Sequence, residues 1–210
     1  MKIVETYNEL IWSASYEGEN DDEFTKLFKK WTDLEYLTSF ITQNQRYLIN
    51  NLHFAGYTVK DVIMNANREA RSFRSLFVEY YNNQLTNKHP NLDDRFVFLN
   101  KTIDGKDDLK RKMYGHPKDD AQMTSVLRLY AVKVPSKEKT KPPAYIITGG
   151  GIKLSDAMPD MKELKKEYPK IELVQSWLKQ HRITNKEQLI EYQNNANKKN
   201  NKLGETGAQN

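Results

Sequence analysis

Three consecutive glycines, Gly149–Gly151, stand between an apolar run and a lone lysine, Lys153. A Walker-type phosphate loop needs a glycine, four further residues and then Gly-Lys-Ser/Thr, whereas a dinucleotide-binding loop needs G-x-G-x-x-G. The order GGGIKLS fits neither pattern. The other interpretation is that the glycines bend a strand or let a neighbouring backbone approach closely. Such a bend would direct Lys153 onto one face of a sheet, and the sequence favours this interpretation over nucleotide binding.

Any chemistry in this chain has to proceed without thiols. The chain has no cysteine and only four histidines, whose scattered positions show no metal-ligand spacing, so we expect no metal and no cofactor. RNA strand scission suits such a residue set, because the attacking 2′-hydroxyl belongs to the substrate. The protein then positions the phosphate, balances its charge and helps to transfer a proton. Residue types suited to these roles are found at Arg128, Tyr130, Lys153, Tyr114 and His116.

The charge distribution also favours an anionic partner. The formal net charge is +5, and the first 35 residues are acidic while the chain from Lys101 onward is rich in lysine. The polar segment 103–124 concentrates basic residues, and we expect it to be a mobile loop. One interpretation of its central part, Lys110–Lys118, is an RNA-contacting arm. In that arm Tyr114 would stack on a base and His116 would titrate near neutrality. The proposed RNA-binding residues are Lys110, Arg111, Lys112, Tyr114 and His116. The simpler alternative is a solvated charged loop.

The N-terminal half is expected to be mainly helical. An extended stretch at the N-terminus is followed by a helix that begins near Asp21 or Asp22 and buries the face containing Phe24, Leu27, Phe28 and Trp31. The pair Thr32-Asp33 is expected to cap a helix that continues to about Asn51. Thr58 is expected to cap a long helix that ends before the turn at Asn87–Pro90. Residues 33–85 would then form a helical insertion within one domain, 1–195.

The C-terminal half changes to the two-residue period of strands. Segment 95–102 is expected to be a strand, and Ser125–Pro135 and Ala144–Gly150 are expected to form a hairpin. A helix with an N-cap at Ser155 or Asp156 should be kinked or split at Pro169. A short helix at Lys186–Gln193 follows, and the polar tail, 196–210, should be disordered.

Two segments of the second half resemble the RelE/HigB-like toxins of toxin–antitoxin systems. They are VLRLYAV, residues 126–132, and the stretch from YIITGGGIK to the helix that follows, so that the similarity covers roughly residues 125–180. Arg128 and Tyr130 fall on the first motif, and Gly150, Ile152, Lys153 and Pro159 fall on the second. The family's paired lysine is here Lys153-Leu154, and the helical insertion makes this chain about twice the family's usual length.

The resemblance implies an α+β, RelE-like fold: a small antiparallel or mixed sheet with N-terminal helices, the helical insertion and a C-terminal helix. It also implies a metal-independent endoribonuclease that cleaves mRNA, commonly on the ribosome, and inhibits translation and growth. A cognate antitoxin, expected to be a helix-turn-helix protein, would be its partner. If the family's residue roles are transferred to the matching positions of this chain, Arg128 contacts the scissile or adjacent phosphate and Lys153 stabilises the charge that develops there. Tyr130 is the third catalytic candidate.

Several alternatives remain open at this level. Arg128 would instead be a strand arginine paired with a carboxylate, and Tyr130 would be a core residue. The domain as a whole would instead be an inactive RelE-like binding module that contacts a protein or nucleic acid through its helical insertion. No apolar run approaches the roughly 20 residues of a membrane span, and the N-terminus lacks signal-peptide features, so we expect a cytoplasmic protein with no membrane partner.

Overall fold

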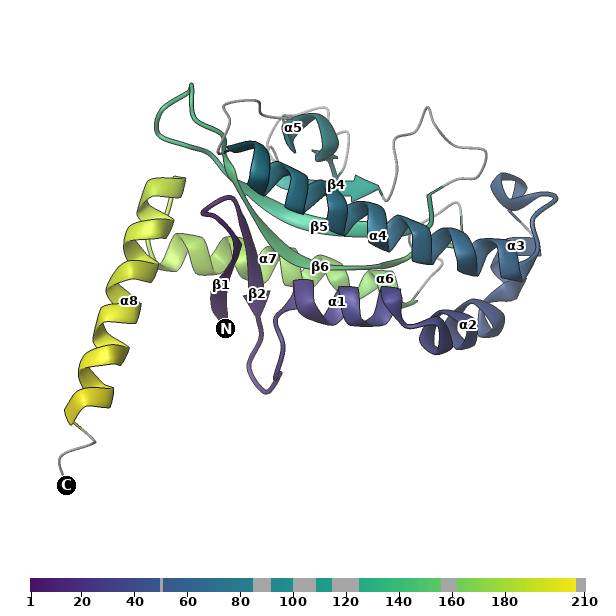
Figure 1. The fold of residues 1–210 in the computed structure, drawn as a ribbon, viewed down its shortest axis with the longest axis horizontal. Helices are drawn as coiled ribbons and strands as arrows, with labels where there is room; N and C mark the ends of the chain where they lie inside the picture. The colour runs from purple at the N-terminus through teal and green to yellow at the C-terminus, as the bar shows by residue number, and fades with distance from the viewer. Residues whose placement is uncertain (50, 85–91, 100–108, 115–124, 156–161, 207–210) are drawn as a thin grey trace.

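A mixed β-sheet lies at the centre of the fold, with helices on both faces (Figure 1). The computed structural model describes residues 1–49, 51–84, 92–99, 109–114, 125–155 and 162–206. Its strands are β1 (Lys2–Tyr7), β2 (Ile11–Ser15), β3 (Val97–Phe98), β4 (Lys110–Tyr114), β5 (Leu127–Val134) and β6 (Ala144–Ile152). Within the described ranges the order across the sheet is β1-β2-β6-β5-β4-β3. The pair β2–β6 is parallel and the other pairs are antiparallel, which confirms the expected α+β class.

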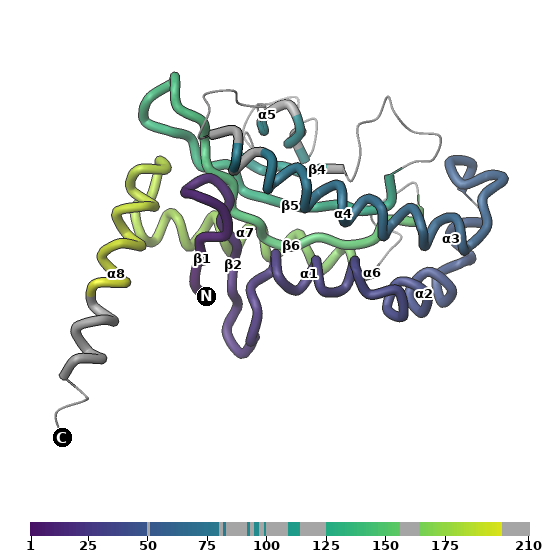
Figure 2. Tube along the Cα trace, viewed as in Figure 1, coloured from purple at the N-terminus to yellow at the C-terminus, as the bar shows by residue number. Residues whose placement is uncertain are grey.

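The helices occupy two layers around this sheet (Figures 1 and 2). They are α1 (Glu23–Thr32), α2 (Leu34–Gln43), α3 (Gln45–Ile49), the 3₁₀ turn η1 (Leu52–Phe54), α4 (Val59–Gln84), α5 (Leu92–Arg95), α6 (Lys162–Lys165), α7 (Glu167–Gln180) and α8 (Lys186–Thr206). Helices α1 and α4 cover one face, and α6 and α7 cover the other. Helix α8 extends away from the sheet beside β1.

Local capping chemistry accounts for the starts of three helices. Asp22 accepts a hydrogen bond from the Thr25 amide at the start of α1, and Asp33 accepts from the Tyr36 amide at the start of α2. Thr58 Oγ1 accepts from the Asp61 amide at the start of α4. These side chains satisfy amides that lack an intrahelical partner, as capping residues do. The three predicted helix starts are confirmed.

An aromatic core joins α1 to α4 on one face of the sheet. Phe24, Phe28 and Trp31 on α1 lie against Phe73 and Phe77 on α4, with the Trp31 and Phe73 ring centroids 5.8 Å apart. All five side chains are buried, so burial of their apolar surface is a main force that fixes the helical insertion against the sheet. The amphipathic pattern of both helices made this core predictable.

Four of the secondary-structure predictions made from the sequence were wrong. The N-terminal extended stretch is a hairpin, in which Asn8–Leu10 form the turn between β1 and β2 and Asn8 and Glu9 adopt positive φ angles of 36° and 61°. The helix expected at 33–51 is divided into α2 and α3, and the 3₁₀ turn η1 follows it. The loop expected at 103–124 contains β4, whose basic sequence lacks strand alternation and which pairs with β5. Helix α8 continues to Thr206, through most of the tail for which we predicted disorder.

The remaining C-terminal predictions are partly confirmed. Strands β5 and β6 form the expected hairpin. The expected strand at 95–102 is reduced to Val97–Phe98 and follows the short helix α5. The helix split occurs at Lys166, and Pro169 lies in the first turn of α7, where its missing N–H costs no hydrogen bond. Pro159 and the proposed cap at Asp156 lie outside the described residues.

Candidate functional site

The glycine run lies where two parallel strands separate. Strands β2 and β6 pair only between Ile11–Ser13 and Tyr145–Ile147. Beyond this point β2 leads to α1 on one face of the sheet, and β6 leads to α6 and α7 on the other. In open α/β sheets, ligands usually bind outside the carboxyl ends of parallel strands, at the point where the connections leave on opposite faces. The region between α1 and α7 beside the glycine run, here called the crevice, is therefore the first candidate site.

The glycines allow helices to approach both faces of β6. A Cβ atom at Gly149 would lie 1.8 Å from Glu167 Oε2, and one at Gly151 would lie 2.8 Å from Leu164 Cδ2, both on the α6–α7 side. A Cβ atom at Gly150 would lie 2.4 Å from Arg128 O and 3.1 Å from Leu27 Cδ1, on the α1 side. These separations are shorter than ordinary van der Waals contacts. The glycines thus serve close packing, as the second sequence interpretation predicted.

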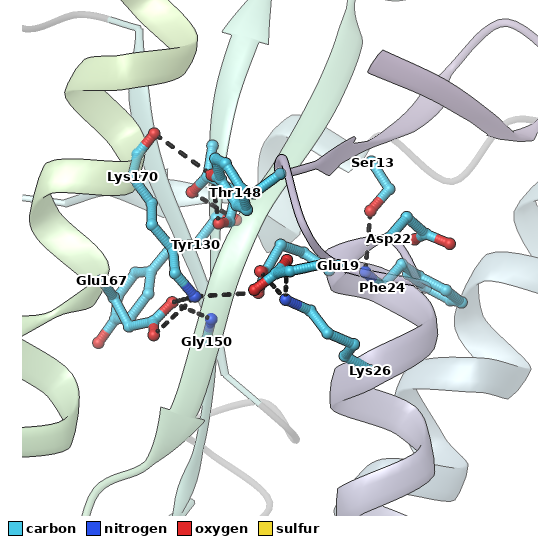
Figure 3. A network of polar contacts seen from close by, with 12 residues as sticks. Ser13, Glu19, Asp22, Phe24, Lys26, Tyr130, Thr148, Gly150, Glu167 and Lys170 are labelled. Carbon is cyan, nitrogen blue, oxygen red and sulfur yellow. Dashed lines mark hydrogen bonds and ion pairs between the residues drawn. The ribbon is translucent and has the colours of Figure 1, made fainter. Parts of the chain in front are cut away.

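Charged side chains from α1 and α7 fill the crevice (Figure 3). Lys170 Nζ lies 3.2 Å from Glu23 Oε2 and 3.1 Å from Glu167 Oε1, so one ammonium joins the two helices. Glu167 Oε2 also accepts a hydrogen bond of 3.0 Å from the Gly150 amide. Lys26 pairs with Glu23 at 2.5 Å and also with Glu19. The amide that a bound phosphate would require therefore donates to a carboxylate instead.

The electrostatics of this crevice are those of a closed, slightly acidic network. Three carboxylates, on Glu19, Glu23 and Glu167, face two ammonium groups, on Lys26 and Lys170. Burial raises the pKa of Glu167, although the nearby Lys170 charge acts in the opposite direction. Each charged group has a partner within the network, so the arrangement holds the two helical layers together. An excess of carboxylate would repel RNA phosphates.

Tyr16 completes the polar lining of the crevice. Its hydroxyl donates a hydrogen bond of 2.9 Å to the carbonyl of Thr148, next to the glycine run. Burial, together with the neighbouring carboxylates, raises the pKa of Tyr16 well above its usual value. The phenol therefore stays protonated and acts as a fixed hydrogen-bond donor.

Replacing Glu167 with glutamine is expected to remove a pH dependence of stability. Because burial raises the pKa of Glu167 in the folded protein, the unfolded chain releases this proton first, from about pH 4.3 upward. The contribution of Glu167 to stability is thus complete below that pH and decreases as the pH rises through the folded-state pKa. Urea unfolding from pH 4 to 8 should show wild type losing stability relative to Glu167→Gln. The exposed Glu17→Gln is the control, and a relative gain by wild type with rising pH would contradict the assignment.

Two of the three predicted catalytic residues share the sheet face that α7 covers. Arg128 pairs with Gly151 and Tyr130 with Gly149, so the alternation of side chains puts both on this face. Lys153 follows the last residue of β6, and its amide donates to Val126 O. Arg128 is only 7% exposed and Tyr130 only 1% exposed, while Lys153 is half-buried.

Arg128 is held by groups at the start of β5. One guanidinium nitrogen, Nη1, donates bonds of 2.8 Å to both Ser125 O and Leu127 O, and it lies 3.3 Å from Ser125 Oγ. Ser125 Oγ in turn donates to the buried carboxylate of Glu69 on α4. Arg128 is thus linked to a carboxylate through Ser125. The sequence-based alternative to a catalytic role was an arginine paired directly with a carboxylate, and the observed arrangement differs from it only by the intervening serine.

Four of the five predicted RNA-binding residues lie in strand β4 of the sheet. Lys110 pairs with Glu172 on α7, and Lys112 Nζ donates a bond of 3.0 Å to Leu99 O. Arg111 is 4% exposed and donates to the carbonyl of Lys110. Tyr114 ends β4 opposite Arg128, and His116 lies outside the described residues. The segment 110–114 is therefore a paired strand, which corrects the prediction of a mobile arm at these positions.

A basic face on α4 was not singled out from the sequence. Arg68, Arg71 and Arg74 recur every third residue on the exposed side of this helix. Arg71 and Arg74 border an open groove of about 690 Å³, which is also lined by Ser75, Val78, Glu79 and Asn82. Within the described part of the chain no carboxylate forms an ion pair with Arg71 or Arg74. The signal was present as RxxRxxR opposite the apolar stripe, but we used only the apolar stripe.

The described residues contain neither a metal-holding cluster of side chains nor a membrane-spanning helix. Across those ranges, no three histidine, aspartate or glutamate side chains come together in a way that could hold a metal ion. None of the described helices has the length and apolar character needed to cross a membrane.

Comparisons with protein-family models, with curated proteins and with solved structures find no match to this chain. The resemblance to RelE/HigB-like toxins therefore rests on the two sequence motifs alone.

Proposed function

We propose that the protein binds RNA through the face of α4 that carries Arg68, Arg71 and Arg74, here called the arginine face. The observation that supports this most directly is the pair Arg71 and Arg74, which border an open groove and have no carboxylate partner among the described residues. A guanidinium group presents a fixed fork of N–H donors that matches the oxygens of a phosphate. Two such groups on consecutive turns suit a strand of phosphates.

The scaffold beneath this face supports the same function. Helix α4 buries Ala66, Ala70, Phe73 and Phe77 against the core, so its exposed side is held on a rigid element. Because the backbone of this helix is already ordered, only the arginine side chains lose conformational freedom when a ligand binds. The net charge of +5 adds a long-range attraction for polyanions. The arginine face lies within the helical insertion, where the binding-module alternative was expected to make its contacts.

A second candidate is the mRNA-cleaving toxin implied by the family resemblance, with ribosome-bound mRNA as substrate and a helix-turn-helix antitoxin as partner. Its support is that Arg128 lies on β5 opposite Gly151 and that Lys153 follows β6 directly, with its amide bonded to Val126 O, so the two residues lie at the same end of the β5–β6 hairpin. The contacts around Arg128 weigh against it, because they are made within the protein. RNA binding through α4 is therefore our first proposal, and cleavage is the second.

Replacing Arg71 and Arg74 together with alanine is expected to weaken RNA binding at least tenfold at low salt. For single-stranded RNA, each phosphate contact contributes about −0.7 to the slope of log affinity against log salt concentration. Loss of two contacts should therefore make this slope less steep by about 1.4. Fluorescence anisotropy with a labelled 20-nucleotide RNA measures both quantities.

The control for this pair is Lys137→Ala with Lys139→Ala, which removes the same charge from an exposed loop. Equal losses of affinity in the two double variants would show that only net charge matters and would reject the arginine face. The same RNA resolved on a gel after incubation distinguishes the two candidates. RNA shortened by wild type but left intact by Lys153→Ala would establish cleavage as an additional activity.

A further inference from the structure

Three aromatic rings meet where α7 ends and α8 begins. The ring centroids of Trp177 and His181 are 4.5 Å apart, and those of His181 and Tyr192 are 4.8 Å apart. Tyr192 is 37% exposed, and the other two rings are half-buried. The buried residues Leu178, Ile183 and Leu189 already provide an apolar contact at this junction. The partly exposed rings therefore form an aromatic surface at the edge of this contact.

A shallow cavity of about 260 Å³ adjoins these rings and is here called the α7–α8 pocket. It is lined by His181, Arg182, Ile183, Gln188, Glu191, Tyr192 and Asn195. The two amides and one carboxylate among these side chains supply both hydrogen-bond donors and acceptors. Gln188 uses its carbonyl oxygen to accept from the Thr184 amide, which leaves its NH₂ group as a donor toward a ligand. A flat aromatic ring with polar edges is the kind of ligand that this lining suits.

Arg182, on the rim of the pocket, is held in an unfavourable backbone conformation. Its φ angle is +56°, at the position that follows α7, where glycine is the preferred residue. The surrounding hydrogen bonds fix this geometry, because the Arg182 amide donates to Lys179 O at 3.1 Å and the Ile183 amide donates to Leu178 O at 2.9 Å. A strained residue that is exposed and charged points to a function for its side chain. Within the described residues, the guanidinium has no ion-pair partner.

We propose that the α7–α8 pocket binds one nucleotide, with the base against the rings of Tyr192 and His181 and the phosphate on Arg182. Aromatic stacking accepts any base, whereas the amides and the carboxylate would contact the base edge. The ligand class rests on the proposed RNA binding, but the residues do not, since α4 and α7 lie on opposite faces of the sheet (Figure 1). The shared chemistry, an aromatic base next to a phosphate, also describes a free nucleotide.

Tyr192→Leu is expected to reduce affinity for a uridine decamer about tenfold, within the range measured for loss of one stacked base. An abasic decamer with the same phosphates should bind wild type and Tyr192→Leu equally. Trp12 and Trp31 are buried, so quenching of tryptophan fluorescence on binding would report mainly on Trp177. Tyr57→Leu, at a half-buried tyrosine in a different part of the chain, is the matched control and should not change affinity.

Arg182→Gly separates function from structure at the same pocket. Glycine relieves the positive φ angle, so this variant should melt at a higher temperature than wild type while its affinity for the decamer falls severalfold. Higher stability with unchanged affinity would overturn a role for the guanidinium in binding. Uridine monophosphate is tested in parallel. If it binds wild type and Tyr192→Leu weakens this binding, the pocket takes a free nucleotide. If only the decamer binds, the pocket takes a nucleotide of an RNA strand.

The pocket is rejected if neither Tyr192→Leu nor Arg182→Gly weakens binding of any of these ligands. This failure can be distinguished from failure of the proposed function. In that case Arg71→Ala with Arg74→Ala would still reduce binding of the normal and the abasic decamer alike. If instead Tyr192→Leu weakens RNA binding while Arg71→Ala with Arg74→Ala does not, the pocket is supported and RNA binding by the arginine face is rejected.

Discussion

Gly150→Ala is expected to lower the free energy of unfolding by about 3 kcal/mol, at the upper end of the range for overpacked interiors. The added methyl group would lie 2.4 Å from Arg128 O, a backbone atom of the adjoining strand, and 3.3 Å from the Trp31 ring. A backbone atom in the middle of a sheet cannot rotate away as a side chain can. Strand β6 would have to shift, and the hydrogen bond from the Gly150 amide to Glu167 would be strained as well. Urea denaturation at neutral pH measures the change.

The control for Gly150→Ala is Gly18→Ala, where no atom lies within 4 Å of the new methyl group but φ is +79°. This control should cost about 1 kcal/mol, from backbone conformation alone. Gly151→Ala should fall between the two, because its new methyl group meets the end of the flexible Leu164 side chain at 2.8 Å. If Gly150→Ala is no more costly than Gly18→Ala, the close approach of β5 to β6 is not as described.

Glu69→Ala is expected to cost about 4 kcal/mol, because it leaves several buried donors without an acceptor. The carboxylate of Glu69 is 1% exposed and accepts from the Val126 amide at 3.0 Å and from the Leu127 amide at 2.8 Å. It also accepts from Ser125 Oγ at 2.9 Å, and Ser125 contacts Arg128. One side chain on α4 thus fixes the beginning of β5 and, through Ser125, the position of Arg128.

Glu69→Gln should lose only part of this stability, since it keeps one acceptor oxygen and nearly the same volume. Glu79→Ala, at an exposed position on the same helix, provides the control and should change stability by less than about 0.5 kcal/mol. Amide hydrogen exchange gives a second measurement, because the amides of Val126 and Leu127 should exchange faster in Glu69→Ala. Unchanged protection of these two amides would contradict the assigned hydrogen bonds.

The features that could be predicted from the sequence are those that depend on neighbouring residues. The caps at Asp22, Asp33 and Thr58 each act on amides two or three residues away, so the chemistry that starts each helix is contained in a short segment. The apolar face of α4 is similarly local, because the period of the helix places Phe73 and Phe77 on one side. For the same reason the sequence predicted the β5–β6 hairpin.

The features that could not be predicted depend on residues distant in the sequence. Glu23 looked like an ordinary acidic residue in the first turn of α1, and its partner Lys170 lies 147 positions away. A bend or close approach at the glycine run was predicted, but the sequence gives no sign that Glu167 would be the group that approaches. Strand β4 shows little strand propensity in its own sequence and exists because β5 pairs with it. We also did not predict from the sequence that α7 would cover Arg128 and Tyr130.

The parallel pairing of β2 with β6 also has a consequence during synthesis of the chain. Ile11 pairs with Tyr145, so the N-terminal hairpin has no neighbouring strand until 134 further residues have been made. At a synthesis rate of about 5–20 residues per second, the wait is on the order of ten seconds. Until then the edge of β2 that pairs with β6 in the finished protein has no strand partner for its backbone N–H and C=O groups. We therefore expect a holding chaperone that binds extended segments to recognise this edge in the nascent chain, and slow codons after the hairpin to prolong the interval.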